Sequence, residues 1–86
     1  MPTISVFYGI VIKMFFSDHD PAHIHVEYGG DEAVLALAGG RVIRGSVPPR
    51  ALRLVRTWIS LHEEELAENW RLAKARLPVA RVEPLP

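Results

Sequence analysis

One long stretch of the chain, residues 50–77, contains neither glycine nor proline, and it limits the possible folds more than any other feature. Pro48 and Pro49 directly precede it, and proline suits the first turn of a helix because its missing N–H would have no partner there. Apolar residues recur through the stretch at helical spacing. The sequence therefore predicts a single long helix over residues 50–77, which at about 1.5 Å per residue would measure roughly 40 Å.

The apolar residues of this helix fall into two adjacent stripes. The longer stripe consists of Leu52, Val55, Ile59, His62, Leu66, Trp70, Ala73 and Leu77. The second stripe consists of Leu54, Trp58 and Leu61. One face of a sheet covers only part of so broad an apolar surface, so we expect Leu54, Trp58 and Leu61 to contact a second copy of the chain or another protein.

The part of the chain before the helix has the pattern of β-strands. Its β-rich or alternating segments are residues 4–8, 10–16, 23–28, 32–38 and 41–47. Gly9 is expected to form a bulge or a turn between the first two segments, and glycine pairs end the third and fourth. The sequence thus predicts an α+β fold, with an antiparallel β-meander of about four strands followed by one long C-terminal helix.

The domain organisation is simple. With 86 residues, the chain supports one domain, which we assign to residues 1–78, followed by an extended proline-rich tail over residues 79–86. The tail either docks as an edge segment or stays free. No cysteine is present, which excludes disulfides and thiolate metal sites. The longest apolar run, residues 9–16, is interrupted by Lys13 and is far shorter than the roughly 20 residues that span a bilayer, so we expect a cytoplasmic protein.

The net charge is zero, which disfavours a strong non-specific nucleic-acid binder, but the charges are segregated. Between residues 41 and 56 the chain has five arginines and no acid, namely Arg41, Arg44, Arg50, Arg53 and Arg56. One interpretation is ordinary surface patterning that supports self-association. The other is a local basic face for RNA, DNA or an acidic partner, with Arg44, Arg50 and Arg53 as binding residues.

The segment 18–27, Asp-His-Asp-Pro-Ala-His-Ile-His-Val-Glu, concentrates the chemically reactive side chains. Residues two apart in a strand point to the same side, so His23, His25 and Glu27 are expected on one face and Ile24 and Val26 on the other. Two imidazoles and a carboxylate are a possible ligand set for zinc or another divalent metal. No other cofactor is indicated.

A metal-free site is the alternative for the same segment. His23 and His25 would then transfer protons or contact phosphate, with Asp18 as a third catalytic candidate. His19, Asp20 and Glu27 are the candidate binding residues beside them. A purely structural role is equally concrete, because aspartates favour turns by bonding to their own backbone and strand histidines often pair with carboxylates.

These motifs together resemble the bacterial family catalogued as domain of unknown function 4160. The resemblance extends from Met1 to about Pro84, and segment 18–29 is its most specific part. It also rests on residues 7–12, on residues 50–55 with Trp58, and on residues 61–66 with Asn69 and Trp70. The chain departs from the family pattern at Ala22, where a second proline is expected, and at Ile24, where an aromatic residue is expected.

The resemblance implies a small cytoplasmic protein that is often encoded beside another small uncharacterised protein, an arrangement similar to toxin–antitoxin pairs. We therefore expect a component of a two-protein module of toxin–antitoxin type, which acts on or binds RNA through the His/Asp loop and the basic face. Its partner would be a second copy in a homodimer or the small protein encoded nearby. Two alternatives remain open: a non-enzymatic protein-binding adaptor, and a metal-binding hydrolase-like site at His23 and His25.

Overall fold

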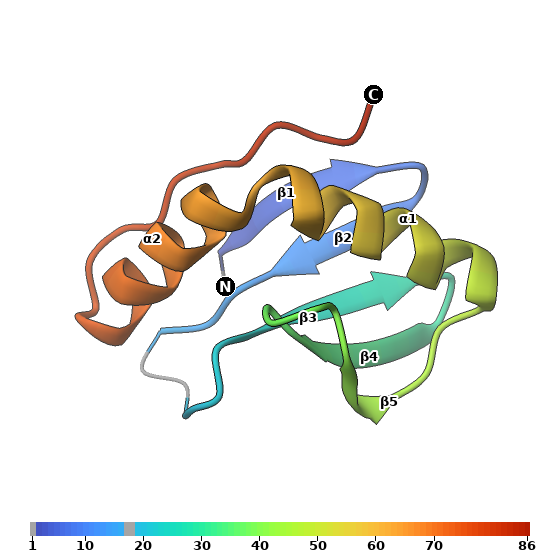
Figure 1. Cartoon of the computed structure of the whole chain (residues 1–86), viewed down its shortest axis with the longest axis horizontal. Helices are drawn as coiled ribbons and strands as arrows, with labels where there is room; N and C mark the ends of the chain where they lie inside the picture. Colours follow the sequence, from blue (N-terminus) through green and yellow to red (C-terminus); the bar gives the residue numbers. More distant parts are fainter. Residues whose placement is uncertain (1, 17–18) are drawn as a thin grey trace.

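The chain forms an α+β fold of five strands and two helices in the computed structural model, which describes residues 2–16 and 19–86. The elements are β1 (Thr3–Phe7), β2 (Ile10–Lys13), β3 (His23–Tyr28), β4 (Asp31–Ala36), β5 (Val42–Gly45), α1 (Pro49–Leu61) and α2 (Glu63–Lys74). The strands are all antiparallel and lie side by side in chain order, so the sheet is a simple meander. Both helices follow the sheet and lie on one side of it (Figure 1).

The predicted α+β class is confirmed, but the estimate of about four strands is too low. The first two predicted segments contain a hairpin of two separate strands, β1 and β2, in which Phe7 pairs with Ile10. Tyr8 and Gly9 connect the two strands, and both have positive φ angles, 51° and 77°. Positive φ at both central residues is what a tight hairpin turn requires, so Gly9 reverses the chain and does not merely kink a strand.

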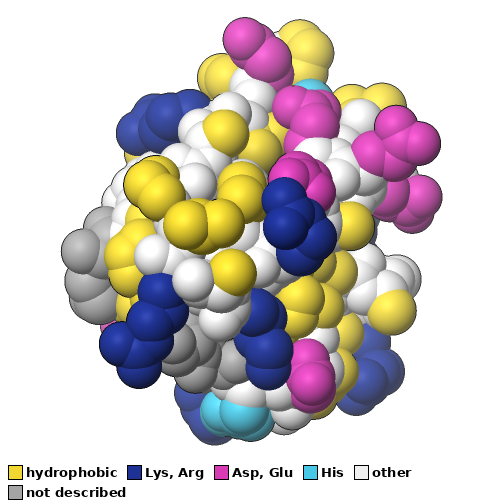
Figure 2. Space-filling view, turned by 90° about the vertical axis from the view of Figure 1, so that its left-hand side faces the viewer, with side chains coloured by type: hydrophobic (Ala, Val, Ile, Leu, Met, Phe, Trp, Pro, Cys, Tyr) yellow, Lys and Arg dark blue, Asp and Glu magenta, His cyan; other side chains and the backbone are white. Residues whose placement is uncertain are grey.

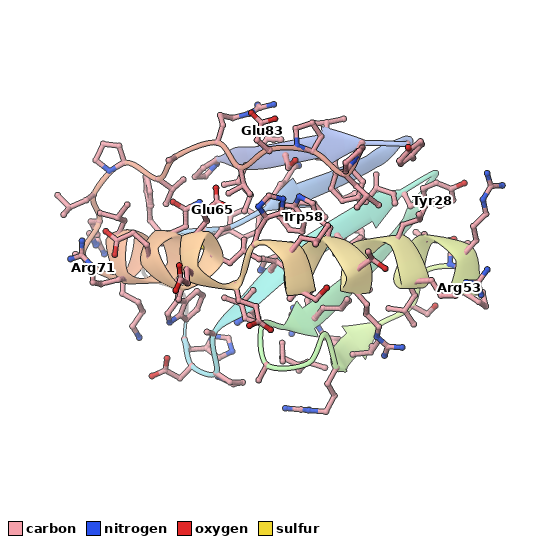
Figure 3. All side chains as sticks on the ribbon, turned by 45° about the horizontal axis from the view of Figure 1, so that its top comes forward. Tyr28, Arg53, Trp58, Glu65, Arg71 and Glu83 are labelled. Carbon is pink, nitrogen blue, oxygen red and sulfur yellow. The ribbon has the colours of Figure 1, made fainter. Side chains whose placement is uncertain are left out.

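The predicted single helix is interrupted at His62. This residue has φ −131° and ψ 32°, outside the helical range, and it separates α1 from α2. The two helices still follow one another along the same side of the sheet (Figure 3). A straight helix of roughly 40 Å would overhang a molecule whose longest extent is 32 Å, and the break lets both halves pack on one small domain.

The start of α2 shows why the break falls at His62. Glu63, Glu64 and Glu65 occupy the first turn, where carboxylates are favoured by the positive end of the helix dipole. The imidazole of His62 lies 2.6 Å from Glu65 through Nδ1 and Oε1, which ties the junction to the third residue of the new helix. A run of glutamates is a helix-start signal, although neither glycine nor proline marks this boundary.

The hydrophobic core lies between the sheet and the helices. Ile24 and Val26 of β3 are fully buried, as the alternation predicts, and they belong to one cluster with Val55 and Trp58 of α1. The Trp58 ring also lies 5.4 Å from the ring of Phe7, measured between centroids. These contacts make Trp58 the centre of the core.

The burial of Trp58 corrects the predicted interface. Its side chain has no exposed surface, so in this fold Trp58 stabilises the protein itself and cannot contact a partner. Leu54 is partly buried against the same core. Leu61 is the only one of the three predicted interface residues that is largely exposed, at 59%.

The proline-rich tail over residues 79–86 docks along the edge of the domain (Figure 1). The backbone N–H of Val82 donates to the carbonyl of Ile4 in β1 at 2.8 Å, and the Val82 side chain is buried. Trp58 donates its indole N–H to the carbonyl of Glu83 at 2.8 Å. The first of the two predicted alternatives, an edge segment, is therefore the one the structure adopts. Over the described residues, no helix is long and apolar enough to cross a membrane.

Candidate histidine site

The sheet has a second face, opposite the helices, which we call the open face. Register and burial assign to it Lys13, His25, Glu27, Glu32, Val34 and Arg44. None of the described helices covers this face (Figure 1). The predicted alternation is confirmed here, since His25 and Glu27 lie on the open face while Ile24 and Val26 face the core.

His23 stands at the start of β3 and is held firmly in place. Its side chain is buried, with only 4% of its surface exposed. Nδ1 lies 2.7 Å from the carbonyl oxygen of Pro21, and because a carbonyl only accepts, Nδ1–H is the donor. In the neutral ring Nε2 then carries the lone pair that can accept a proton.

Three imidazoles gather at this end of the sheet. The ring of His23 has its centroid 5.6 Å from that of His19 and 5.2 Å from that of His25. The cluster has an aromatic frame, because Trp70 of α2 lies 5.1 Å from His23 and Phe15 lies edge-on at 4.3 Å from His25. The structure thus brings together His19, His23 and His25, which the sequence singles out.

The frame residues Phe15 and Trp70 were not predicted to belong to the site. Trp70 is a member of the apolar helix stripe, which by itself indicates only packing. The ammonium group of Lys74 lies 5.9 Å from the Trp70 ring centre and 3.7 Å from Asp20. Asp20 therefore links the histidine loop to the end of α2, and no signal in the sequence connects these two distant segments.

A small cavity of about 50 Å³ opens among the three histidines. Its lining consists of His19, Pro21, His23, His25, Val34, Ile43 and Arg44. The guanidinium group of Arg44 supplies N–H donors, and the imidazole rings of His19 and His25 each carry an N–H group as well. The cavity is therefore suited to a small anionic group.

A larger cavity of about 390 Å³ adjoins it on the open face. The two cavities share His25, Val34 and Arg44. Phe15, Glu27, Glu32 and Gly45 are among the further residues that line the larger one. Lys13 and Glu27 form an ion pair at 2.8 Å between neighbouring strands.

The predicted metal set of His23, His25 and Glu27 is not assembled. The carboxylate of Glu27 is engaged by Lys13, away from the histidine cavity. Within residues 2–16 and 19–86, no three histidine, aspartate, glutamate or cysteine side chains are grouped to hold a metal ion. The third catalytic candidate, Asp18, lies outside the described residues.

The predicted basic face is also divided. Arg44 of β5 lines both cavities on the open face. Arg50 and Arg53 belong to α1, which packs on the opposite side of the sheet, and Figure 3 shows Arg53 near the start of that helix. Of the three arginines, only Arg44 therefore lies at the histidine site. The pairing of β5 with β4 places it on the open face, whereas Arg50 and Arg53 lie in α1 on the opposite side of the sheet.

Charge is segregated on the end of the molecule where α2 terminates. Figure 2 shows a histidine at the lower edge of this end, with lysine and arginine side chains above it. Most of the acidic side chains that are visible in this view lie toward its upper right. The three glutamates of the first turn of α2 lie apart from the residues that line the histidine cavity.

Comparison with known proteins identifies one family. A family model described as "Domain of unknown function (DUF4160)" matches residues 9–71, which include the histidine segment, strands β2 to β5, all of α1 and most of α2. No curated protein and no solved structure matches the chain.

Proposed function

This chain belongs to the family of the domain of unknown function DUF4160, and we propose that it is the RNA-directed component of a two-protein module of toxin–antitoxin type. The observation that carries this proposal is the cavity in which His19, His23, His25 and Arg44 converge. Its ligand would be the phosphodiester backbone of RNA.

The donor set supports a phosphate ligand. Guanidinium groups bind phosphate oxygens through a rigid fork of N–H groups, and charge-assisted hydrogen bonds of this kind are about twice as strong as neutral ones. The cavity of about 50 Å³ admits only a small group, which a single phosphoryl group satisfies. Phe15 and Trp70 beside the histidines add aromatic surface of the kind on which unpaired bases stack.

The histidine pair also has the chemistry for RNA cleavage. His23 and His25 are 5.2 Å apart between ring centroids, so one ring can remove the proton of a ribose 2′-OH and the other can protonate the leaving 5′ oxygen. The 2′ oxygen attacks phosphorus, the P–O5′ bond breaks, and a cyclic phosphate forms. Arg44 would stabilise the charge that develops on the phosphoryl oxygens.

The test uses the purified protein and a short fluorescently labelled single-stranded RNA at low salt. We expect Arg44→Ala to weaken binding by roughly tenfold. The slope of log affinity against log salt concentration should fall by about one, the value for one lost phosphate contact. His25→Ala should abolish any strand cleavage, followed as labelled fragments on a denaturing gel. Arg53→Ala is the matched control, because it removes an exposed arginine from the opposite side of the molecule.

Two results would refute the proposal. One is the absence of RNA binding by the wild-type protein. The other is an equal loss in Arg44→Ala and Arg53→Ala, which would indicate general charge attraction and no site. Binding without cleavage would retain the site and remove its catalytic role.

The two-protein part of the proposal is supported by apolar surface near the helix junction. Leu61 is largely exposed, and residues of both helices and of the segment after β4 line a cavity of about 350 Å³, among them Leu37, Ile59, Leu66 and Trp70. Expression in a bacterial host with and without the neighbouring gene tests it. We expect growth arrest that the neighbour relieves and that His25→Ala prevents; arrest in neither setting would count against a toxin.

Light scattering on the purified chain tests the identity of the partner. A dimer mass would indicate a homodimer, and a monomer mass would favour a different protein as the partner.

A further inference from the structure

We infer that the larger cavity on the open face is a base-binding subsite that selects an unpaired nucleobase with an exocyclic amino group over uracil. This inference rests on the proposed function, because it gives the histidine cavity its neighbouring recognition site. It predicts which RNA sequence the protein prefers.

The position and size of the cavity fit a nucleoside attached to the bound phosphate. The cavity has a volume of about 390 Å³, within the roughly 300–1,000 Å³ that is common for small-molecule sites. It shares His25, Val34 and Arg44 with the histidine cavity, so the two cavities are immediate neighbours on the open face. A nucleotide whose phosphate contacts Arg44 would therefore have its base directed over the open face.

Phe15 supplies the aromatic wall of this subsite. It is partly exposed, and its ring meets the ring of His25 edge-on at an interplanar angle of 86°. An edge-on contact covers at most one face of either ring, and bases stack on aromatic faces with little dependence on their identity. The Phe15 wall therefore provides affinity, and the selection must come from polar groups.

One glutamate of an opposed pair, Glu32, provides the selective group. Glu27 of β3 and Glu32 of β4 stand directly opposite each other on the open face, an arrangement that repels and destabilises a sheet. Lys13 neutralises Glu27 at 2.8 Å. Among the described residues, no ion pair or hydrogen bond involves the Glu32 side chain, which leaves its carboxylate available to a ligand.

A carboxylate only accepts hydrogen bonds, so it selects the base edge that donates them. Cytosine, adenine and guanine carry exocyclic amino groups, and carboxylates pair with the amino group of cytosine in known recognition. Uracil has the carbonyl oxygen O4 where cytosine has its amino group, and a carboxylate repels that oxygen. Glu32 and Arg44 both line the cavity, so together they match a ligand with an amino group and a phosphate.

The experiment measures the affinity of the full chain for two labelled oligonucleotides of equal length, oligo(C) and oligo(U), by fluorescence anisotropy. Both are pyrimidines, so stacking area and charge are matched. We expect oligo(C) to bind about tenfold more tightly, which corresponds to one good carboxylate–amine contact. Glu32→Gln should bring the two affinities close together. Glu64→Gln is the control, because it makes the same change on α2, outside both cavities.

The outcomes separate this inference from the proposed function. Equal binding of both oligonucleotides by the wild type, or a preference that persists in Glu32→Gln, would overturn the base subsite and leave the phosphate site standing. Binding of neither would overturn both. Loss of the preference in Glu32→Gln alone, with Glu64→Gln unchanged, would establish Glu32 as the specificity-determining residue.

Discussion

The two faces of the sheet differ in almost every physical property. The face under the helices is built from fully buried apolar side chains such as Ile10, Ile12 and Leu35, packed against Trp58. The open face carries Lys13, His25, Glu27, Glu32 and Arg44, and two adjoining cavities. An antiparallel sheet commonly has one buried face and one solvated face, but solvation alone does not require opposed glutamates or clustered histidines.

The polar side chains on the two sides of the sheet also differ in their hydrogen bonding. On the helix side, Trp58 donates to Glu83, and Asn69 exchanges two hydrogen bonds with the backbone of Ala80. Among the described residues, Ser5 Oγ is the buried side-chain polar atom without a partner. On the open face, Glu32 and Arg44 are exposed and do not pair with each other. The helix side therefore holds the fold together, and the open face is available for ligands.

Among the substitutions that test this difference between the two faces, the largest loss of stability is expected at Trp58. Trp58→Ala should lower the free energy of unfolding by about 3–5 kcal/mol, because it empties the centre of the core. That is a large part of the roughly 5–15 kcal/mol available to a small domain. Phe15→Ala on the open face is the matched aromatic truncation and should cost much less, since its ring is partly exposed. Urea denaturation followed by circular dichroism measures both, and equal losses would show that the open face is a second core.

The sequence predicts the features of the fold that are local and misses those that depend on tertiary packing. Ile24 and Val26 could be assigned to the core, and His23, His25 and Glu27 to one side of a strand, because alternation in a strand is a local property. The helix boundary at His62 was missed, because the break depends on how much sheet there is to cover. Its local signal was the glutamate run that follows.

The histidine site was predicted only in part, for a similar reason. His19, His23 and His25 lie close together in the sequence, so their grouping was visible. Phe15, Trp70 and Arg44 join them from the segment after β2, from α2 and from β5 respectively. Such contacts between distant segments follow from tertiary packing, which neither composition nor periodicity specifies.

A smaller effect is expected at the docked tail, where Asn69 is bonded to the backbone of Ala80. Asn69→Ala should lower the free energy of unfolding by about 1–3 kcal/mol, because it leaves the N–H and carbonyl of Ala80 without their partner. It should also speed tryptic cleavage after Arg81, as the tail leaves the β1 edge more often. Tyr8→Phe is the control, since it removes an exposed hydrogen bond from the same tail, between Tyr8 and Pro86. If both variants cleave at the wild-type rate, the buried pair does not hold the tail.

The smallest effect is expected at the exposed ion pair of Glu68 and Arg71 on α2. The hydrogen bond from Arg71, with its positive charge, holds the pKa of Glu68 below its ordinary value of 4.5. Because the folded-state pKa is the lower one, the pair stabilises the protein above pH 4.5 and this contribution is lost as the pH falls through the folded-state value.

The corresponding test compares wild type and Glu68→Gln by urea denaturation across that pH range. We expect a small deficit in the variant at neutral pH, which disappears in acid and shrinks in high salt because exposed pairs are screened. Glu64→Gln, which removes an exposed glutamate from the first turn of the same helix, controls for loss of charge alone. A Glu68→Gln deficit that persists in acid would assign the effect to helix propensity or packing. In that case the exposed ion pair would add nothing to stability, and among the polar groups on the helix side only buried pairs such as Asn69 with Ala80 would stabilise the fold.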